Sequence, residues 1–200
     1  MNWRCVAAVL LAAGFCALPA VVADDDEDEE AGEQGFKARL SGYSEVPAIS
    51  TTGKGELRLA LDEGATSLAF ELEYSDLKGT TVSAVHIHLG APGTNGGPVV
   101  FLCGGGGNPA CPPSGAVTGT IAASDIVANA GQGVEAGGFA SVLDALRAGV
   151  AYVNVHTNRF PDGEIRGNIG WPPGKAWGHG KDKDKGKGHG KDKDGDDDGQ

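Results

Sequence analysis

Polar and hydrophobic residues alternate along the middle of the chain. In the segment FKARL, Phe36, Ala38 and Leu40 alternate with Lys37 and Arg39. Side chains two positions apart in a β-strand point to the same face, so this alternation predicts strands with one buried and one outward face. Eight such segments, separated by Gly, Pro, Asn and Asp, follow one another: residues 36–40, 55–61, 67–74, 81–89, 98–103, 115–121, 151–156 and 163–169.

One segment has a different period. In FASVLDALRAG, Val142, Leu143 and Leu146 recur at helical spacing, and Gly149 is typical of a helix end. Many short strands and one short helix predict an all-β domain over residues 36–170. Its expected architecture is an antiparallel β-sandwich or Greek-key barrel.

The alternation also assigns a face to the histidines in the segment VHIHL. Val85 and Ile87 occupy the apolar positions, so they are expected to face the core. His86 and His88 occupy the alternate positions and are expected to point outward, on the same side of their strand. The sequence therefore predicts two adjacent imidazoles outside the hydrophobic core.

A third histidine lies in the last pair of predicted strands. The alternation places Asn154 and His156 outward in one strand, and Glu164 and Arg166 outward in the next. The residues Pro-Asp-Gly at positions 161–163 favour a turn, so the two strands should form a hairpin with these polar side chains on one face. The alternation does not give the order of strands, so the distance from the third histidine to the other two stays open.

Composition divides the rest of the chain into three segments. Residues 1–23 combine an early arginine, a short apolar run and small residues before the end, which predicts a signal peptide cleaved after Ala23. Residues 24–35 are mostly acidic, and residues 171–200 are dominated by Gly, Lys, Asp and His; both compositions are typical of disorder. The leader's apolar run is shorter than the roughly 20 residues of a spanning helix, so no transmembrane segment is expected after cleavage.

The charge balance bears on possible partners. The chain has a formal net charge of −11, and its acidic residues include a continuous run near the N-terminus. Nucleic-acid binding needs a basic footprint, which this distribution lacks. We therefore expect no nucleic-acid partner.

The cysteines predict one disulfide. Cys5 and Cys16 lie in the expected signal peptide, which leaves Cys103 and Cys111 in the mature chain. One pair in an exported protein is most simply a disulfide. The alternative is a redox or metal-binding pair, but the two cysteines lack CxxC spacing.

Two segments carry a resemblance to a known family. SAVHIHLGAPGTNGGPVVFL at residues 83–102 and LRAGVAYVNVHTNRFPDGEIRGNI at residues 146–169 resemble the CHRD domain. That domain is named from chordin, a secreted antagonist of bone morphogenetic proteins, and also occurs alone in bacterial exported proteins. The resemblance implies an immunoglobulin-like Greek-key β-sandwich with a distant likeness to copper/zinc superoxide dismutase, and no settled activity.

The first functional hypothesis is a non-catalytic binding or structural module without a cofactor. The protein would be secreted, periplasmic or at the cell surface, and its partner an unidentified extracellular or periplasmic protein or surface. The outward polar residues would then form a hydrogen-bond network in which Arg166 pairs with Glu164. No other constellation typical of catalysis is present in the sequence.

The alternative hypothesis is one copper or zinc ion bound by His86, His88 and His156, with redox enzymology less expected. Three outward residues would orient the rings: Asn154, Glu164 and Arg166. A two-metal dismutase centre needs more histidines than this domain has. Ligands of one ion should have nitrogens about 3–4 Å apart, and a separation of His156 beyond about 8 Å from both other rings would exclude the site.

Overall fold

The computed structural model describes residues 35–170. The predicted signal peptide, nearly all of the acidic segment and the C-terminal tail lie outside the described residues, so the predictions made for them stay untested. All eight predicted strands and the histidines His86, His88 and His156 lie inside the described part.

The eight predicted strands are all present, within one or two residues of their predicted ends. The elements are β1 (Gly35–Ser41), η1 (Gly42–Ser44), β2 (Lys54–Leu61), β3 (Ser67–Ser75), β4 (Val82–Leu89), β5 (Pro98–Cys103), β6 (Gly115–Ala122), η2 (Ala123–Asp125), η3 (Ala130–Gln132), α1 (Phe139–Arg147), β7 (Ala151–Thr157) and β8 (Ile165–Ile169). Among the described residues α1 is the one α-helix, as the sequence predicted.

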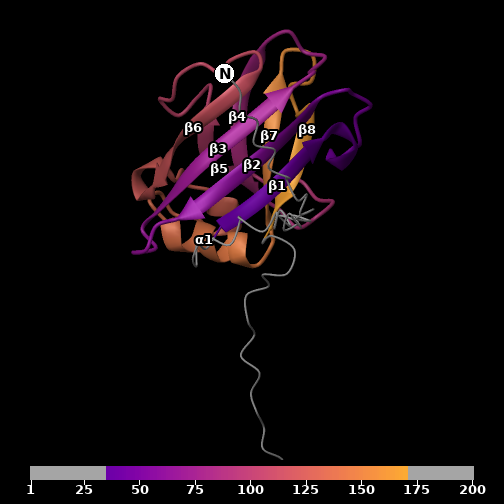
Figure 1. The fold of residues 1–200 in the computed structure, drawn as a ribbon. Coiled ribbons are helices and arrows are strands. Elements are labelled where there is room, and N and C mark those ends of the chain that lie inside the picture. The colour runs from indigo at the N-terminus through magenta and orange to yellow at the C-terminus, as the bar shows by residue number, and fades with distance from the viewer. Residues whose placement is uncertain (1–34, 171–200) are drawn as a thin grey trace, which may run out of the picture. The chain divides into compact units, whose positions relative to one another are not determined.

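The strands form one antiparallel sheet that folds over on itself. Its order is β5-β4-β7-β8-β1-β2-β3-β6, so several neighbours in the sheet are far apart in the chain. Pairing between β8 and β1 is sparse, with Ser41 opposite Arg166 and an isolated bridge from Lys37 to Gly170. This sparse seam divides the sheet into two four-stranded halves that pack face to face (Figure 1). The edge strands of the two halves approach each other near the bridge between Val100 and Ile126, so the sheet is nearly closed.

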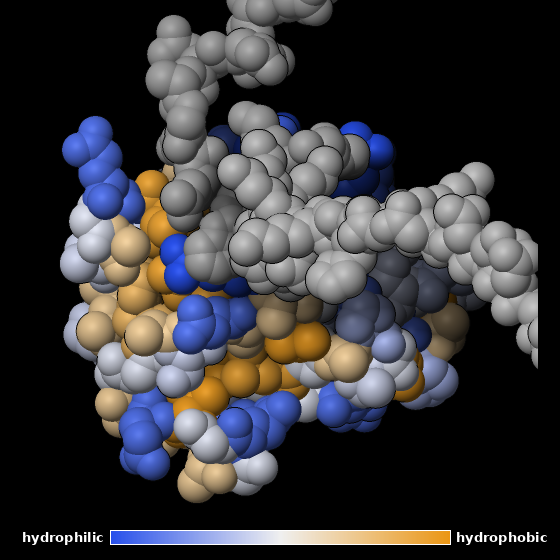
Figure 2. Space-filling model, turned by 90° about the horizontal axis from the view of Figure 1, so that it is seen from below, coloured by the Kyte–Doolittle hydropathy of each residue, from blue (hydrophilic) through white to orange (hydrophobic). Residues whose placement is uncertain are grey.

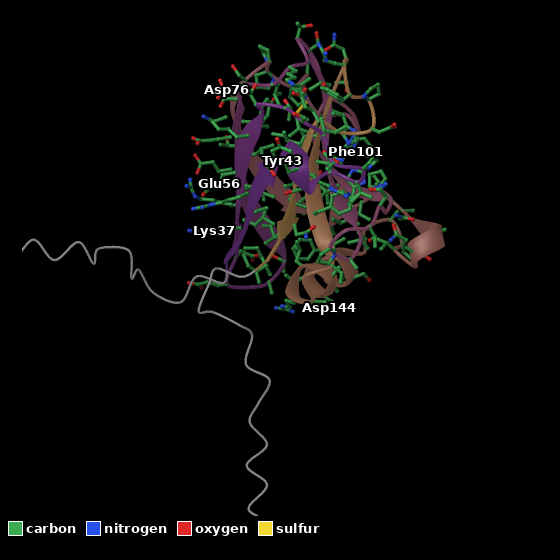
Figure 3. All side chains as sticks on the ribbon, turned by 90° about the vertical axis from the view of Figure 1, so that its right-hand side faces the viewer. Lys37, Tyr43, Glu56, Asp76, Phe101 and Asp144 are labelled. Carbon is green, nitrogen blue, oxygen red and sulfur yellow. A yellow bond between two sulfur atoms is a disulfide. The ribbon has the colours of Figure 1, made fainter. Side chains whose placement is uncertain are left out.

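The inner faces of both halves make up the hydrophobic core. The residues predicted to face inward are buried, apart from the half-buried Leu61 at the end of β2; in β3, for example, Leu68, Leu72 and Tyr74 have at most 2% of their surface exposed. The alternate residues face solvent on the half that contains β1: Lys37 and Glu56 point away from the sandwich, while Phe101 lies on its opposite side (Figure 3). The all-β fold predicted from the alternation is confirmed.

The helix α1 closes one end of the sandwich. Its buried residues, Phe139, Val142, Leu143 and Leu146, pack into the core, and the amide of Gly149 bonds to the carbonyl of Leu146 just past its end. Seen from this end, the surface shows apolar side chains with hydrophilic ones around them (Figure 2). Within residues 35–170, no helix has both the length and the apolar character needed to cross a membrane.

The seam between β8 and β1 requires a glycine. A Cβ atom at Gly167 would collide with the carbonyl oxygen of Arg39 and lie 2.7 Å from its carbonyl carbon. Because both atoms belong to the backbone of β1, they cannot move aside without breaking the seam. Gly170, three residues further along, has open space at the same position.

We predict that Gly167→Ala lowers the free energy of unfolding by roughly 2–3 kcal/mol, as overpacking against backbone does. Gly170→Ala is the matched control and should change it by less than about 0.5 kcal/mol. Urea unfolding at equilibrium measures both values. Equal stabilities of the two variants would show that β1 and β8 do not approach as closely as described.

The predicted disulfide is present. Cys103, at the end of β5, is bonded to Cys111, 8 residues further along the chain. The bond closes a glycine-rich loop beside β4, and Cys103 itself is buried in the core. It therefore anchors the edge strand β5 to the segment that leads into β6.

Replacing both cysteines by serine should lower the free energy of unfolding by about 2–3 kcal/mol, since the unfolded chain regains the entropy of an open loop. Urea unfolding of Cys103→Ser/Cys111→Ser against the oxidised wild type measures the difference. Wild-type protein under reducing conditions is the control and should approach the variant. Two alkylatable thiols in native oxidised protein would refute the bond.

Candidate metal centre

The three histidines come together because β4 and β7 are neighbours. In the antiparallel register His86 lies opposite Asn154, His88 opposite Tyr152, and Ala84 opposite His156. His156 is therefore diagonal to His86 on the same outer face. The alternation predicted the face of each histidine correctly, and the strand order supplies the contact that it left open.

The ring separations lie well inside the limit of about 8 Å that would exclude a shared site, but the nitrogens are not yet at ligand spacing. Ring centroids are 4.8 Å apart for His86 and His156, 5.4 Å for His86 and His88, and 5.7 Å for His88 and His156. One nitrogen from each ring can be chosen so that all three lie within 4.8 Å of one another. This is somewhat wider than the 3–4 Å expected for ligands of one ion, so the rings must rotate slightly to meet it.

Backbone carbonyls orient two of the rings. Nδ1 of His88 lies 3.0 Å from the carbonyl oxygen of Gly96, and Nδ1 of His156 lies 2.9 Å from that of Pro161. A carbonyl oxygen can only accept, so both Nδ1 atoms carry the proton and both Nε2 atoms keep a free lone pair. Within the described residues these two Nε2 atoms are buried without a partner, as are both nitrogens of His86. Metal-binding histidines show this pattern.

The site also holds its histidines neutral. Burial, with smaller effects from the other two histidines, lowers the pKa of His86 to about 4. Burial likewise lowers the pKa of His88 to about 4, although its bond to Gly96 acts in the opposite direction. Burial also lowers the pKa of His156. At neutral pH all three rings are thus in the uncharged form that binds metals.

Aromatic rings and a rigid loop surround the cluster. Phe101 of β5 packs edge-on against His86, with centroids 4.3 Å apart, and Tyr152 stacks on His88 at 4.9 Å. The Tyr152 hydroxyl bonds to both the amide and the carbonyl of Gly96, the residue that orients His88. A Cβ at Gly96 would collide with the carbonyl of Leu89, so only glycine allows this loop to approach β4 so closely.

The outer face of β7 and β8 is not exposed to solvent. Asn154, Glu164 and Arg166 point to the predicted side, yet only 3%, 0% and 2% of their respective surfaces are exposed. The loops at residues 42–53 and 90–97 lie over this face and bond to its side chains. The domain therefore has a second, polar interior outside the hydrophobic sandwich.

Arg166 holds both covering loops. Its guanidinium donates to the carbonyl of Ser44 at 2.6 Å, to the carbonyl of Thr94 at 3.2 Å and to Oδ1 of Asn95 at 2.9 Å. Its carboxylate partner is Glu45, 3.6 Å away, so the predicted pairing with Glu164 is wrong. Arg166 also lies 4.8 Å above the ring of Tyr152.

Glu45 is a residue that the sequence analysis missed. It lies in a loop without periodic pattern, so nothing in the sequence distinguished it from other acidic residues. Burial outweighs the attraction of Arg166 and raises the pKa of Glu45 to about 7. Its Oε1 atom is buried without a hydrogen-bond partner within the described residues.

Glu164 accepts hydrogen bonds from other parts of the chain. Its carboxylate accepts hydrogen bonds from the hydroxyls of Thr51 and Thr157 and from the amides of Lys78 and Gly79. Burial alone raises the pKa of this carboxyl, but the four bonds outweigh it, and the pKa lies below the ordinary value. Neither Glu164 nor Arg166 bonds to a histidine ring in residues 35–170; the carbonyls of Gly96 and Pro161 orient the rings instead.

Asn154 occupies the centre of the polar face. Its amide nitrogen lies 3.4 Å from the carbonyl oxygen of Asp162, and its Oδ1 is buried without a partner within the described residues. It stands opposite His86 on one side and opposite Arg166 on the other. Asn154 is thus the side chain between the histidine cluster and the Arg166–Glu45 pair.

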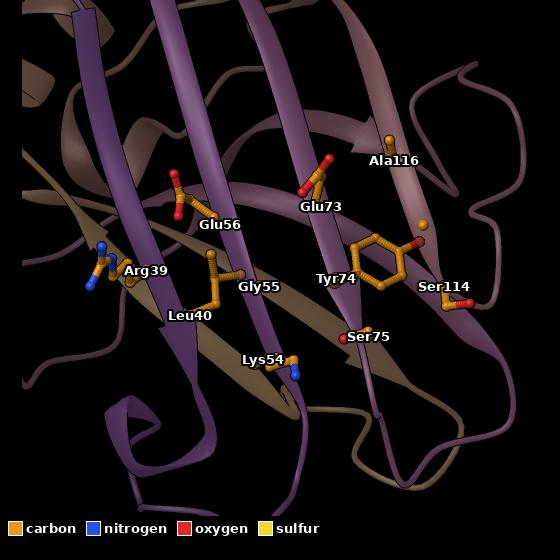
Figure 4. A pocket seen from close by; sticks show the side chains of 11 residues that line it. Arg39, Leu40, Lys54, Gly55, Glu56, Glu73, Tyr74, Ser75, Ser114 and Ala116 are labelled. Carbon is orange, nitrogen blue, oxygen red and sulfur yellow. The ribbon is translucent and has the colours of Figure 1, made fainter. Parts of the chain in front are cut away.

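A separate hollow lies on the half of the sandwich that contains β1. It has a volume of about 670 Å³ and is lined by charged and small residues of β1, β2, β3 and the start of β6 (Figure 4). Tyr74 faces it, and its hydroxyl donates to the carbonyl of Pro112. No histidine lines this hollow, so it is distinct from the candidate metal centre.

Comparison with known proteins identifies the family. The sequence model of the CHRD domain matches residues 36–169, and the chain therefore belongs to the CHRD domain family. Neither the curated proteins nor the solved structures gave a match. The family and its all-β fold agree with the resemblance noted in the sequence.

We predict that Glu164→Gln lowers the free energy of unfolding by on the order of 2 kcal/mol at pH 7, because an amide cannot accept all four hydrogen bonds. The lowered pKa means that Glu164 stabilises the fold fully above its ordinary value of 4.5, and that this contribution is lost as the pH falls through its folded pKa. In the Glu164→Gln variant, the free energy of unfolding should lack this pH-dependent contribution.

Urea unfolding at a series of pH values between about 3 and 7 measures both effects. Glu73→Gln, which removes the same charge from an exposed position on β3, is the control and should match the wild type closely. A Glu164→Gln curve parallel to that of the wild type throughout would contradict the assignment.

Proposed function

We propose that this CHRD domain is a binding module that holds a single copper or zinc ion through His86, His88 and His156. The observation that carries the proposal is the set of three neutral imidazoles whose unpaired ring nitrogens are buried, and two of these rings are oriented by a backbone carbonyl. Burying unpaired ring nitrogens costs free energy unless something occupies their lone pairs. A bound ion supplies that partner.

The donor set suits these two metals. Imidazole nitrogen binds both copper and zinc, whereas magnesium and calcium prefer oxygen ligands. Within the described residues the cluster contains no carboxylate and no thiolate. We propose binding alone as the role of the ion, with no reaction assigned to it.

We also propose that the protein acts outside the cytoplasm. The Cys103–Cys111 disulfide is stable in oxidising compartments, and the first 23 residues have the pattern of a cleaved signal. Outside the cytoplasm, the domain would be exposed to metal ions that cytoplasmic ligands have not already bound. Its further partner would be an extracellular or periplasmic protein or surface.

Metal analysis of the purified full chain, made without an affinity tag, tests the proposal. After incubation with copper or zinc and removal of loose ions by a weak chelator, about one equivalent should remain bound. His86→Ala/His88→Ala/His156→Ala should retain close to none, since no other described cluster offers three ligands.

The control removes the two histidines of the C-terminal segment instead. His179→Ala/His189→Ala should keep the full equivalent, and circular dichroism should show the same strand content in all three proteins. Equal metal content in the triple variant and the wild type would refute the site. A wild-type protein that binds neither metal would leave a metal-free binding module as the function.

A further inference from the structure

We infer that the three-histidine site is built for a monovalent ion with three ligands, and that copper(I), not zinc(II) or copper(II), is the form it holds. The inference rests on the proposed function and narrows it. Three features of the described residues carry it: the donor set, the enclosure of the ring nitrogens and the charges of the polar interior.

The described residues offer three ligands for an ion at this site. His86, His88 and His156 are the members of the cluster, and no carboxylate or cysteine of the described residues joins them. Zinc usually takes four ligands, with water as the fourth where the protein supplies three, and copper(II) favours tetragonal geometry with more than three. Copper(I) carries a single charge and can be satisfied by three ligands in a plane, whereas zinc(II), which also has a filled d shell, usually completes four.

The ring nitrogens that would meet the ion are enclosed. Both nitrogens of His86 and the Nε2 atoms of His88 and His156 are buried, although the residues His86 and His156 are half-buried as a whole. Phe101 and Tyr152 pack against the cluster with their aromatic faces and edges, which offer no lone pair to a metal. A solvent molecule that completes a fourth position would have to displace these contacts.

The charges around the cluster oppose a dication. The positive charge of Arg166 acts on His88 directly, and both side chains lie against the ring of Tyr152. The buried carboxylate in this interior that is nearest to Arg166, Glu45, is already paired with it. Asp162 acts on His156 from an exposed turn, where water screens it.

The free energy of burying an ion grows with the square of its charge, so a dication costs about four times as much as a monocation of the same radius. Three neutral imidazoles offset none of that charge. With no spare buried carboxylate, the interior can accept one additional positive charge far more readily than two.

The ligands can adapt to a small planar site without unfolding it. His88 and His156 are fixed by their carbonyl partners, while His86 has no hydrogen bond in residues 35–170. Rotation of the His86 ring can therefore bring its nitrogen closer to those of the other two rings. His86 can therefore adjust its position around an ion that is already bound by His88 and His156. This arrangement suits an ion that needs only three ligands.

The test compares the affinities of the full chain for each ion, with His179→Ala/His189→Ala as the background that removes histidines outside the domain. Copper(I) is supplied anaerobically in competition with bathocuproine disulfonate, and zinc(II) in competition with a pyridylazo dye. We expect one equivalent of copper(I), with a dissociation constant at least about tenfold below that for zinc(II). Silver(I), a redox-inert monovalent probe, should compete with copper(I) for the same equivalent.

X-ray absorption of the copper-loaded protein should show three nitrogen ligands and no fourth. His86→Ala in the same background should lose the tight copper(I) equivalent while circular dichroism confirms the fold. If zinc(II) or copper(II) binds as tightly as copper(I), or if a fourth ligand is seen, the inference fails and the proposed function stands. If no ion binds, the proposed function itself fails.

Discussion

The buried guanidinium of Arg166 determines how the outer face of this domain is organised. A buried positive charge is costly unless hydrogen bonds and a counter-ion surround it. Here the partners come from two loops that are remote in sequence: Ser44 and Glu45 before β2, and Thr94 and Asn95 before β5. The hydrogen bonds of one side chain therefore hold both loops over β7 and β8, and one of these loops also supplies the Gly96 carbonyl that contacts His88.

This arrangement gives the domain two interiors with different chemistry. The core between the two halves of the sheet is apolar. Strands with the same alternation of residues would form such a core in any protein. The second interior is made of polar and aromatic groups and is held by hydrogen bonds to loop backbone. The same burial that removes water from His86 and His88 also keeps these rings uncharged at neutral pH. Enclosure and neutrality of the candidate site thus have one cause.

The sequence predicted the strands and the facing of the histidines because both depend on local periodicity. His86 and His88 had to share a face once Val85 and Ile87 were assigned to the core. The contact with His156 could not be predicted in this way, since alternation carries no information on strand order. The pairing of Arg166 with Glu45 was missed because loop residues follow no period. The groups that orient the rings were missed for a different reason. They are backbone carbonyls, which every residue has, so the residue types at Gly96 and Pro161 do not indicate this role.

The strands β4 and β7 are far apart in the sequence, and this separation affects the stage of folding at which the three-histidine site can form. The edge strands β5 and β6 and the helix α1 all intervene in the chain before β7 returns to pair with β4. Contacts between segments so far apart form late, because a large loop must close before they contribute. An unfolded chain therefore holds only the His-x-His pair of β4 close together, which is an incomplete set of ligands. If the domain binds an ion as proposed, ligation has to follow folding, and the ion would be acquired in the compartment where the chain folds.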